Sequence, residues 1–124
     1  MVALALLLAA VGGAQPSPVP IDDFSSASES GLPAGWKPLA FKRIPRQTEY
    51  RTERDGGNAY LAARASASAS GLLKEVQVDL GATPVLRWRW RVTGSVKGAD
   101  ARAKSGDDYA ARVYVAFAYD PSRA

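Results

Sequence analysis

The sequence contains no cysteine, no histidine and only one methionine in 124 residues. Without cysteine, these residues form no disulfide and offer no thiol for lipid attachment. Without histidine, Ser-His-Asp and Cys-His catalysis and His- or Cys-ligated zinc sites are excluded. Carboxylates remain for acid–base catalysis or for oxygen ligation of Ca²⁺. These absences favour a binding or structural protein over an enzyme.

The excess of positive charge is small, with 16 Lys and Arg against 12 Asp and Glu and a net charge of +4. No Lys/Arg block is dense enough to indicate nucleic-acid binding. Mild basicity favours anionic partners such as acidic glycans or lipid headgroups, and it also serves plain solubility. The length suits a single domain.

The first 14 residues are almost entirely apolar but too few to span a bilayer. Val2–Val11 predicts the hydrophobic region of a signal peptide, and Gly12–Ala14 offers small residues for cleavage. No Lys or Arg precedes this run, so whether Met1 is the true start stays open, as does a buried strand or short helix here. We expect a periplasmic or secreted protein, with a signal peptide at 1–14, a Pro-rich tether at 15–20 and a domain at 21–124. After cleavage, no membrane-spanning segment is expected.

The most regular stretch is the Arg-Trp segment, Val85–Val92. Apolar and basic residues alternate along it with period two, which predicts a β-strand with one apolar and one basic face. The apolar face carries Leu86, Trp88, Trp90 and Val92, and the basic face carries Arg87, Arg89 and Arg91.

Similar alternation, with turn signals between the runs, predicts further strands. They are Ile21–Phe24, a short strand around Leu39–Lys42, Thr48–Glu53, Tyr60–Ser70, Leu73–Leu80 and Tyr109–Tyr119. Asp55–Asn58 has the composition of a hairpin turn. The alanines of Tyr60–Ser70 also permit a helix. Together these runs predict an all-β antiparallel sandwich or jelly roll. The chain stops soon after a strong strand, so we expect closing strands to be missing and an exposed edge to favour association.

The basic face of the Arg-Trp segment has two interpretations. Guanidinium groups bind carboxylate or sulfate in a bidentate way, so Arg87, Arg89 and Arg91, joined by Arg112 and Tyr114, would form an anion- or sugar-binding face. The alternative is a hairpin between Leu73–Leu80 and Val85–Val92. Its register would neutralise the face by pairing Asp79 with Arg87, Gln77 with Arg89 and Glu75 with Arg91.

The remaining candidates are the three tryptophans and a pair of acids. The acids end the long loop at 93–108. Trp88 and Trp90 share a face with aliphatic residues, which favours core packing over a sugar platform. Trp36 follows Gly35 in a turn, where it would either cap the fold or line a loop-end ligand site. Asp107 and Asp108 would supply oxygen ligands to Ca²⁺, or simply bond the loop; no cofactor is otherwise predicted.

Five motifs resemble a family of exported bacterial proteins that is classified as a domain of unknown function. They are Leu32–Trp36, Lys42–Pro45, Ser68–Leu72, Pro84–Val92 and Gly106–Val115. The resemblance implies a β-sandwich and supplies no activity or catalytic residue. The layout is also similar to galactose-binding-like jelly rolls, a likeness of architecture alone.

We therefore predict non-catalytic binding of an envelope saccharide or other anionic glycan. The alternative is a structural or protein-interaction module of the cell envelope that has no small-molecule ligand. A hydrolase using carboxylates from outside this sequence is a third class. The oligomeric state is not predicted.

Overall fold

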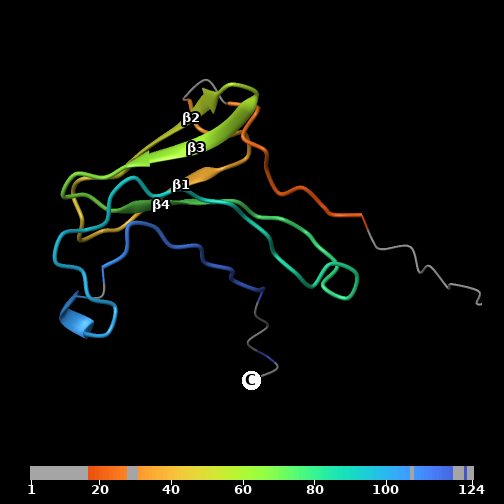
Figure 1. The fold of residues 1–124 in the computed structure, drawn as a ribbon. Coiled ribbons are helices and arrows are strands. Elements are labelled where there is room, and N and C mark those ends of the chain that lie inside the picture. Colours follow the sequence, from red (N-terminus) through yellow and green to blue (C-terminus); the bar gives the residue numbers. More distant parts are fainter. Residues whose placement is uncertain (1–16, 28–30, 107, 119–121, 123–124) are drawn as a thin grey trace, which may run out of the picture. The chain divides into compact units, whose positions relative to one another are not determined.

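A computed structural model of the chain describes residues 17–27, 31–106, 108–118 and 122. Its regular elements are β1 (Lys37–Ala40), β2 (Glu49–Asp55), β3 (Asn58–Arg64), β4 (Ser70–Leu73) and the short 3₁₀-helix η1 (Lys104–Gly106), as Figure 1 shows. The strands form two antiparallel two-stranded sheets, β1–β4 and β2–β3. No α-helix occurs in these ranges, so the prediction of an all-β protein is confirmed at that level. The predicted signal peptide lies outside the described residues.

The chain divides into two units, residues 1–86 and 87–124. All four strands belong to the first unit, and η1 belongs to the second. The boundary falls inside the Arg-Trp segment, between Leu86 and Arg87. The three arginines and both tryptophans of that segment therefore belong to the second unit.

The β2–β3 hairpin is the most regular part of the first unit. Its register runs from Glu49 opposite Arg64 to Asp55 opposite Asn58, with Gly56 and Gly57 between the last pair. Gly56 has a φ of 59°, in the left-handed region, whereas Gly57 does not have a positive φ. A positive φ at the first central residue alone fits a type II′ turn, whose twist matches that of the flanking strands. The predicted hairpin turn is confirmed.

Replacing Gly56 with valine is expected to destabilise the protein by about 1–2 kcal/mol, because a β-branched residue is strained at a positive φ. A Cβ at Gly56 or at Gly57 meets nothing within 4 Å, so backbone conformation alone separates the two positions. Gly57→Ala is thus the matched control, and it should change stability by less than about 0.5 kcal/mol. Urea unfolding measures both. Equal effects of the two substitutions would contradict the turn assignment.

The other sheet pairs β1 with β4, so that Lys37 lies opposite Leu73 and Ala40 opposite Ser70. Ser70 also joins the two sheets. Its Oγ accepts a hydrogen bond from the Thr48 backbone N–H at 3.0 Å, and its backbone oxygen accepts one from the Tyr50 hydroxyl at 2.8 Å. Partial burial raises the pKa of Tyr50, which keeps the hydroxyl protonated as the donor.

The predicted strand Ile21–Phe24 is wrong. The carboxylate of Asp22 accepts a hydrogen bond from the Phe24 N–H at 2.7 Å, and that of Asp23 accepts one from the Ser25 N–H at 2.9 Å. Both are Asx turns, in which an aspartate bonds the backbone two residues ahead and curves the chain. Phe24 has a φ of 58°, which no strand residue adopts.

The predicted strand Tyr60–Ser70 is divided into two shorter ones. β3 ends at Arg64, and β4 begins at Ser70. Between them Ala67 has a φ of 47°, and the Ser68 hydroxyl accepts a hydrogen bond from the Ser66 N–H at 3.1 Å. A serine hydroxyl can hydrogen-bond to nearby backbone groups and so competes with the hydrogen bonds of a β-sheet. The Ala-Ser alternation therefore accompanies a bend rather than a strand, and the helix alternative is also wrong.

Three other predicted strands do not form ladders in the described part of the chain. Leu73–Leu80 contributes only Leu73, the last residue of β4, while Val85–Val92 and the described part of Tyr109–Tyr119 contribute none. Alternation assigns side chains to faces, but a strand also needs a neighbour whose backbone completes the hydrogen bonds. β4 takes β1 as that neighbour, not the segment that follows the Gly81–Pro84 turn.

Burial is slight throughout the described residues. Pro33 is the only one of them that is fully enclosed, and no large apolar side chain among them is fully buried. The apolar residues of the unpaired segments remain exposed, from Val76 to Phe117. Specific polar contacts therefore contribute a larger share of the order in the first unit than they would in a protein with a dense core.

Candidate functional site

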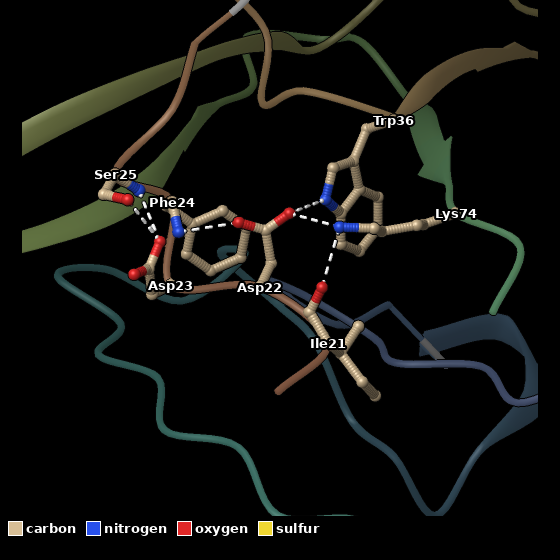
Figure 2. A network of polar contacts seen from close by, with 7 residues as sticks. All are labelled: Ile21, Asp22, Asp23, Phe24, Ser25, Trp36 and Lys74. Atoms are coloured by element: carbon tan, nitrogen blue, oxygen red, sulfur yellow. Dashed lines mark hydrogen bonds and ion pairs between the residues drawn. The ribbon is translucent and has the colours of Figure 1, made fainter. Parts of the chain in front are cut away.

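A polar cluster in the first unit ties residues 21–25 to the end of β4; we call Asp22, Trp36 and Lys74 the clasp. One carboxylate oxygen of Asp22, Oδ2, accepts hydrogen bonds from the Trp36 Nε1–H and from the Lys74 ammonium, each at 2.7 Å. The ammonium also donates to the backbone oxygen of Ile21 at 2.7 Å. Figure 2 shows these groups converging, with the Phe24 ring next to them.

The clasp is the most enclosed ion pair in the described structure. The side chains of Asp22 and Lys74 are 10% and 21% exposed. Burial by itself raises the pKa of Asp22, but hydrogen bonds from Lys74 and from the Phe24 N–H outweigh it, and the pKa falls below its ordinary 3.8. The carboxylate is therefore ionised at neutral pH and bonded through both of its oxygens.

Trp36 makes two further contacts within the clasp. Its ring centroid lies 6.2 Å from that of Phe24, and the Lys74 Nζ lies 5.8 Å from its ring centroid, within range of a cation–π contact. Its N–H is taken up by Asp22. The indole thus helps to hold residues 21–25 against the end of β4, and its predicted role in ligand binding stays a prediction.

The arginines of the Arg-Trp segment are exposed in the second unit. Arg87, Arg89 and Arg91 all present their side chains to solvent, and none of them forms an ion pair within the described residues. Trp88 and Trp90 are 54% and 59% exposed, so the prediction that they pack in a core is wrong here. An apolar strand face is buried only where a second layer covers it.

The acids that were predicted to neutralise this row have other partners. Glu75 lies 3.6 Å from the Lys37 ammonium, across the end of the β1–β4 sheet. The Asp79 carboxylate accepts a hydrogen bond from the Gly81 N–H at 2.8 Å and another from the Ala82 N–H. Asp79 thus shapes the turn instead of facing an arginine, so the predicted hairpin register is wrong.

Arg112 and Tyr114, the other two predicted site residues of the second unit, contact each other. The Arg112 Nη1 donates to the Tyr114 hydroxyl at 3.2 Å, and its guanidinium carbon lies 4.2 Å from the ring centroid of Tyr109. This stacking is a cation–π contact that orients the guanidinium plane. Tyr109 was missed from sequence, because a spacing of three places it and Arg112 on opposite faces of the predicted strand.

Of the two predicted Ca²⁺ ligands, only Asp108 belongs to the part of the chain that the structure describes. Asp107 lies outside the described residues, and Asp108 is exposed. In the described ranges no three Asp or Glu side chains gather as a metal site would require. Nor does any helix in those ranges have the length and apolar character to cross a membrane.

A small hollow of about 120 Å³ lies between the sheets of the first unit, lined by Thr48, Tyr50, Ser70 and their neighbours. The hydroxyl groups of Tyr50 and Ser70 in it bond to backbone groups of Ser70 and Thr48. The hollow has room for a few water molecules, far less than the several hundred Å³ typical of small-molecule sites.

The comparisons with known proteins give one result. Residues 34–124 match the family model described as "Protein of unknown function (DUF3047)". The chain belongs to this family. The predicted resemblance to a domain of unknown function is confirmed. No curated protein and no solved structure matches the chain.

The DUF3047 region covers part of the clasp and all of the candidate ligand surface. It begins at residue 34, so Trp36 and Lys74 fall inside it and Asp22 falls outside. Every arginine and tyrosine of the predicted anion-binding face also lies inside it. The aspartate that completes the clasp therefore lies in a segment outside the matched residues.

Proposed function

We propose that this DUF3047 protein binds an acidic glycan of the bacterial envelope without acting on it chemically. The observation that carries the proposal is the exposed row of Arg87, Arg89 and Arg91, which forms no ion pair with the described residues and whose expected acidic neighbours are bonded elsewhere. Closely spaced guanidiniums repel one another, and a ligand with repeated carboxylates or sulfates relieves that repulsion. Each such group can accept two parallel N–H bonds from one arginine.

The distribution of charge along the chain supports the same surface. Residues 87–124 contain eight Lys and Arg against four Asp and Glu, whereas residues 1–86 contain eight of each. The whole net charge of +4 therefore belongs to the unit that holds the arginine row. A local positive field draws an anionic polymer toward that unit and raises the rate of association.

Export and the finer architecture form part of the proposal. The apolar stretch at 1–14 supports secretion to the periplasm or the medium, where an envelope glycan is available. The alternating segments and the two antiparallel sheets support a β-sandwich for the whole domain. A sandwich would hold the arginine row on a regular sheet face, with successive arginines about 6.7 Å apart.

Thermal denaturation of the exported protein with added oligosaccharides tests the proposal. Oligogalacturonate, which carries one carboxylate per sugar, is expected to raise the melting temperature, because a ligand of the native state stabilises it by mass action. The shift should shrink from 50 mM to about 500 mM NaCl, since salt screens exposed charges. Maltohexaose, a neutral control of similar length, should give none. No shift with oligogalacturonate at low salt would contradict the proposal and favour the structural module.

A further inference from the structure

We infer that Trp36 and Lys74 form a carboxylate-binding site, which Asp22 fills in the manner of a bound ligand and which a small external carboxylate can occupy in its place. The inference goes beyond the proposed function and does not depend on it, because the clasp belongs to the first unit and the arginine row to the second. It gives the clasp a ligand-binding role in addition to its contribution to stability.

The two donors are placed by the β1–β4 sheet and not by Asp22. Trp36 directly precedes β1, and Lys74 directly follows β4. The ladder between these strands ends with Lys37 opposite Leu73, so Trp36 and Lys74 are the next residues outward on the two paired chains. Residues opposite each other in an antiparallel pair lie on the same face, and the Lys74 Nζ indeed lies 5.8 Å from the Trp36 ring centroid. The sheet therefore brings the indole and the ammonium together by itself.

Asp22, in contrast, belongs to an irregular segment outside both sheets, where it forms an Asx turn with the Phe24 N–H. Figure 2 shows its carboxylate between the indole and the ammonium, which both donate to Oδ2 at 2.7 Å. The ammonium also holds the backbone oxygen of Ile21 at 2.7 Å. A separate segment thus places one carboxylate against two donors that the sheet positions, as a ligand would be placed in a site.

The chemistry of the donors selects an anionic oxygen. An indole N–H and an ammonium only donate hydrogen bonds, and the ammonium adds a full positive charge. The Lys74 side chain is 21% exposed, and partial exclusion of water strengthens its bond to an anion. Truncating Asp22 to alanine removes only the carboxylate and leaves a space of that size beside both donors. Formate has the charge and the size of the group that is lost.

Thermal denaturation of Asp22→Ala at neutral pH, in sodium formate and in sodium chloride of equal concentration, tests the site. Charge-assisted hydrogen bonds predict a dissociation constant on the order of 10 mM for formate. A concentration of about 100 mM formate should then raise the melting temperature by roughly 5 °C more than chloride does. The wild-type protein should show no such difference, because Asp22 holds the site from within the chain. Adding Lys74→Met to Asp22→Ala should abolish the formate effect, and adding Trp36→Phe should reduce it.

Equal melting temperatures of Asp22→Ala in the two salts would overturn the inference and leave the clasp as a structural ion pair. A formate effect that persists after Lys74→Met, or that occurs equally in the wild type, would also overturn it, since the effect would then belong to the salt in general. If Asp22→Ala is unfolded in both salts, Asp22→Asn, which keeps an oxygen acceptor, takes its place in the same comparison. Binding of oligogalacturonate is measured separately, so failure of this inference leaves the proposed function standing.

Discussion

Replacing Asp22 with alanine is expected to lower the free energy of unfolding by about 2–3 kcal/mol. The substitution leaves the half-buried Lys74 ammonium without its counter-charge and the Trp36 N–H without its acceptor. Removing one partner of a fully buried pair costs about 3–5 kcal/mol, and partial solvent access to this pair reduces that figure. The loss should also free the segment around Phe24, because both Asp22 oxygens hold it in place.

The neighbouring Asp23 provides the matched control. Its carboxylate is exposed and bonds only the N–H and hydroxyl of Ser25 among the described residues. Asp23→Ala should therefore change stability by less than about 0.5 kcal/mol, although it removes the same charge one position away. Urea unfolding followed by tryptophan fluorescence measures both variants. Similar stabilities for the two would show that the clasp adds nothing to the fold.

The clasp should also make the stability of the fold depend on pH in the acidic range. Hydrogen bonds lower the pKa of Asp22 in the folded state below its ordinary 3.8, so the unfolded chain binds this proton more readily. The stabilisation is then present above pH 3.8 and is lost as the pH falls further through the folded-state value. The difference in melting temperature between wild type and Asp22→Ala should narrow in that range. A difference that stays constant down to pH 2 would contradict this linkage.

The second large effect is expected on binding. An Arg87→Ala/Arg89→Ala variant should bind oligogalacturonate about tenfold to a hundredfold more weakly than wild type, because each guanidinium in contact with a carboxylate contributes about 1 kcal/mol or more. The remaining binding should depend less on salt, since fewer charges are neutralised. Both side chains are exposed, and neither has an ion-pair partner in the described structure, so the fold should be unaffected.

Lys42→Ala/Arg43→Ala is the control for net charge. These two residues are exposed in the first unit, and their loss also lowers the net charge from +4 to +2. If overall charge drives the interaction, the two double variants will weaken binding equally. If the arginine row is the site, only the Arg87/Arg89 variant will do so. Calorimetry at one fixed NaCl concentration gives the comparison.

The sequence predicted those parts of the fold that depend on neighbouring residues. Asp55–Asn58 predicts the hairpin because glycine at a positive φ and a short loop decide its geometry locally. The strand predicted around Leu39–Lys42 overlaps β1, which lies two residues earlier, at Lys37–Ala40. The all-β class follows from the same alternation. The three arginines of the row are exposed, as their charge would lead one to expect.

Contacts between residues far apart in the sequence could not be predicted. Nothing in the local sequence brings Asp22 to Lys74, which lies 52 positions later. The predicted partner of the strand at Leu73–Leu80 was also wrong. The alternation of Val85–Val92 matched it, whereas β4 pairs with β1. Trp88 and Trp90 show the same limit, since alternation does not reveal whether a covering layer exists. The Asx turns at Asp22 and Asp23 did have a local signal, which the apolar residues on either side obscured.

The contacts of the first unit are nested along the chain, which has a consequence for how it folds. The hairpin closes across Gly56 and Gly57, the β1–β4 ladder closes outside it between Ala40 and Ser70, and the clasp closes outside both. Each inner closure shortens the loop that the next one must form, and so lowers its entropic cost. A chain arranged in this way can assemble outward from one central turn, with its most distant ion pair as the final step.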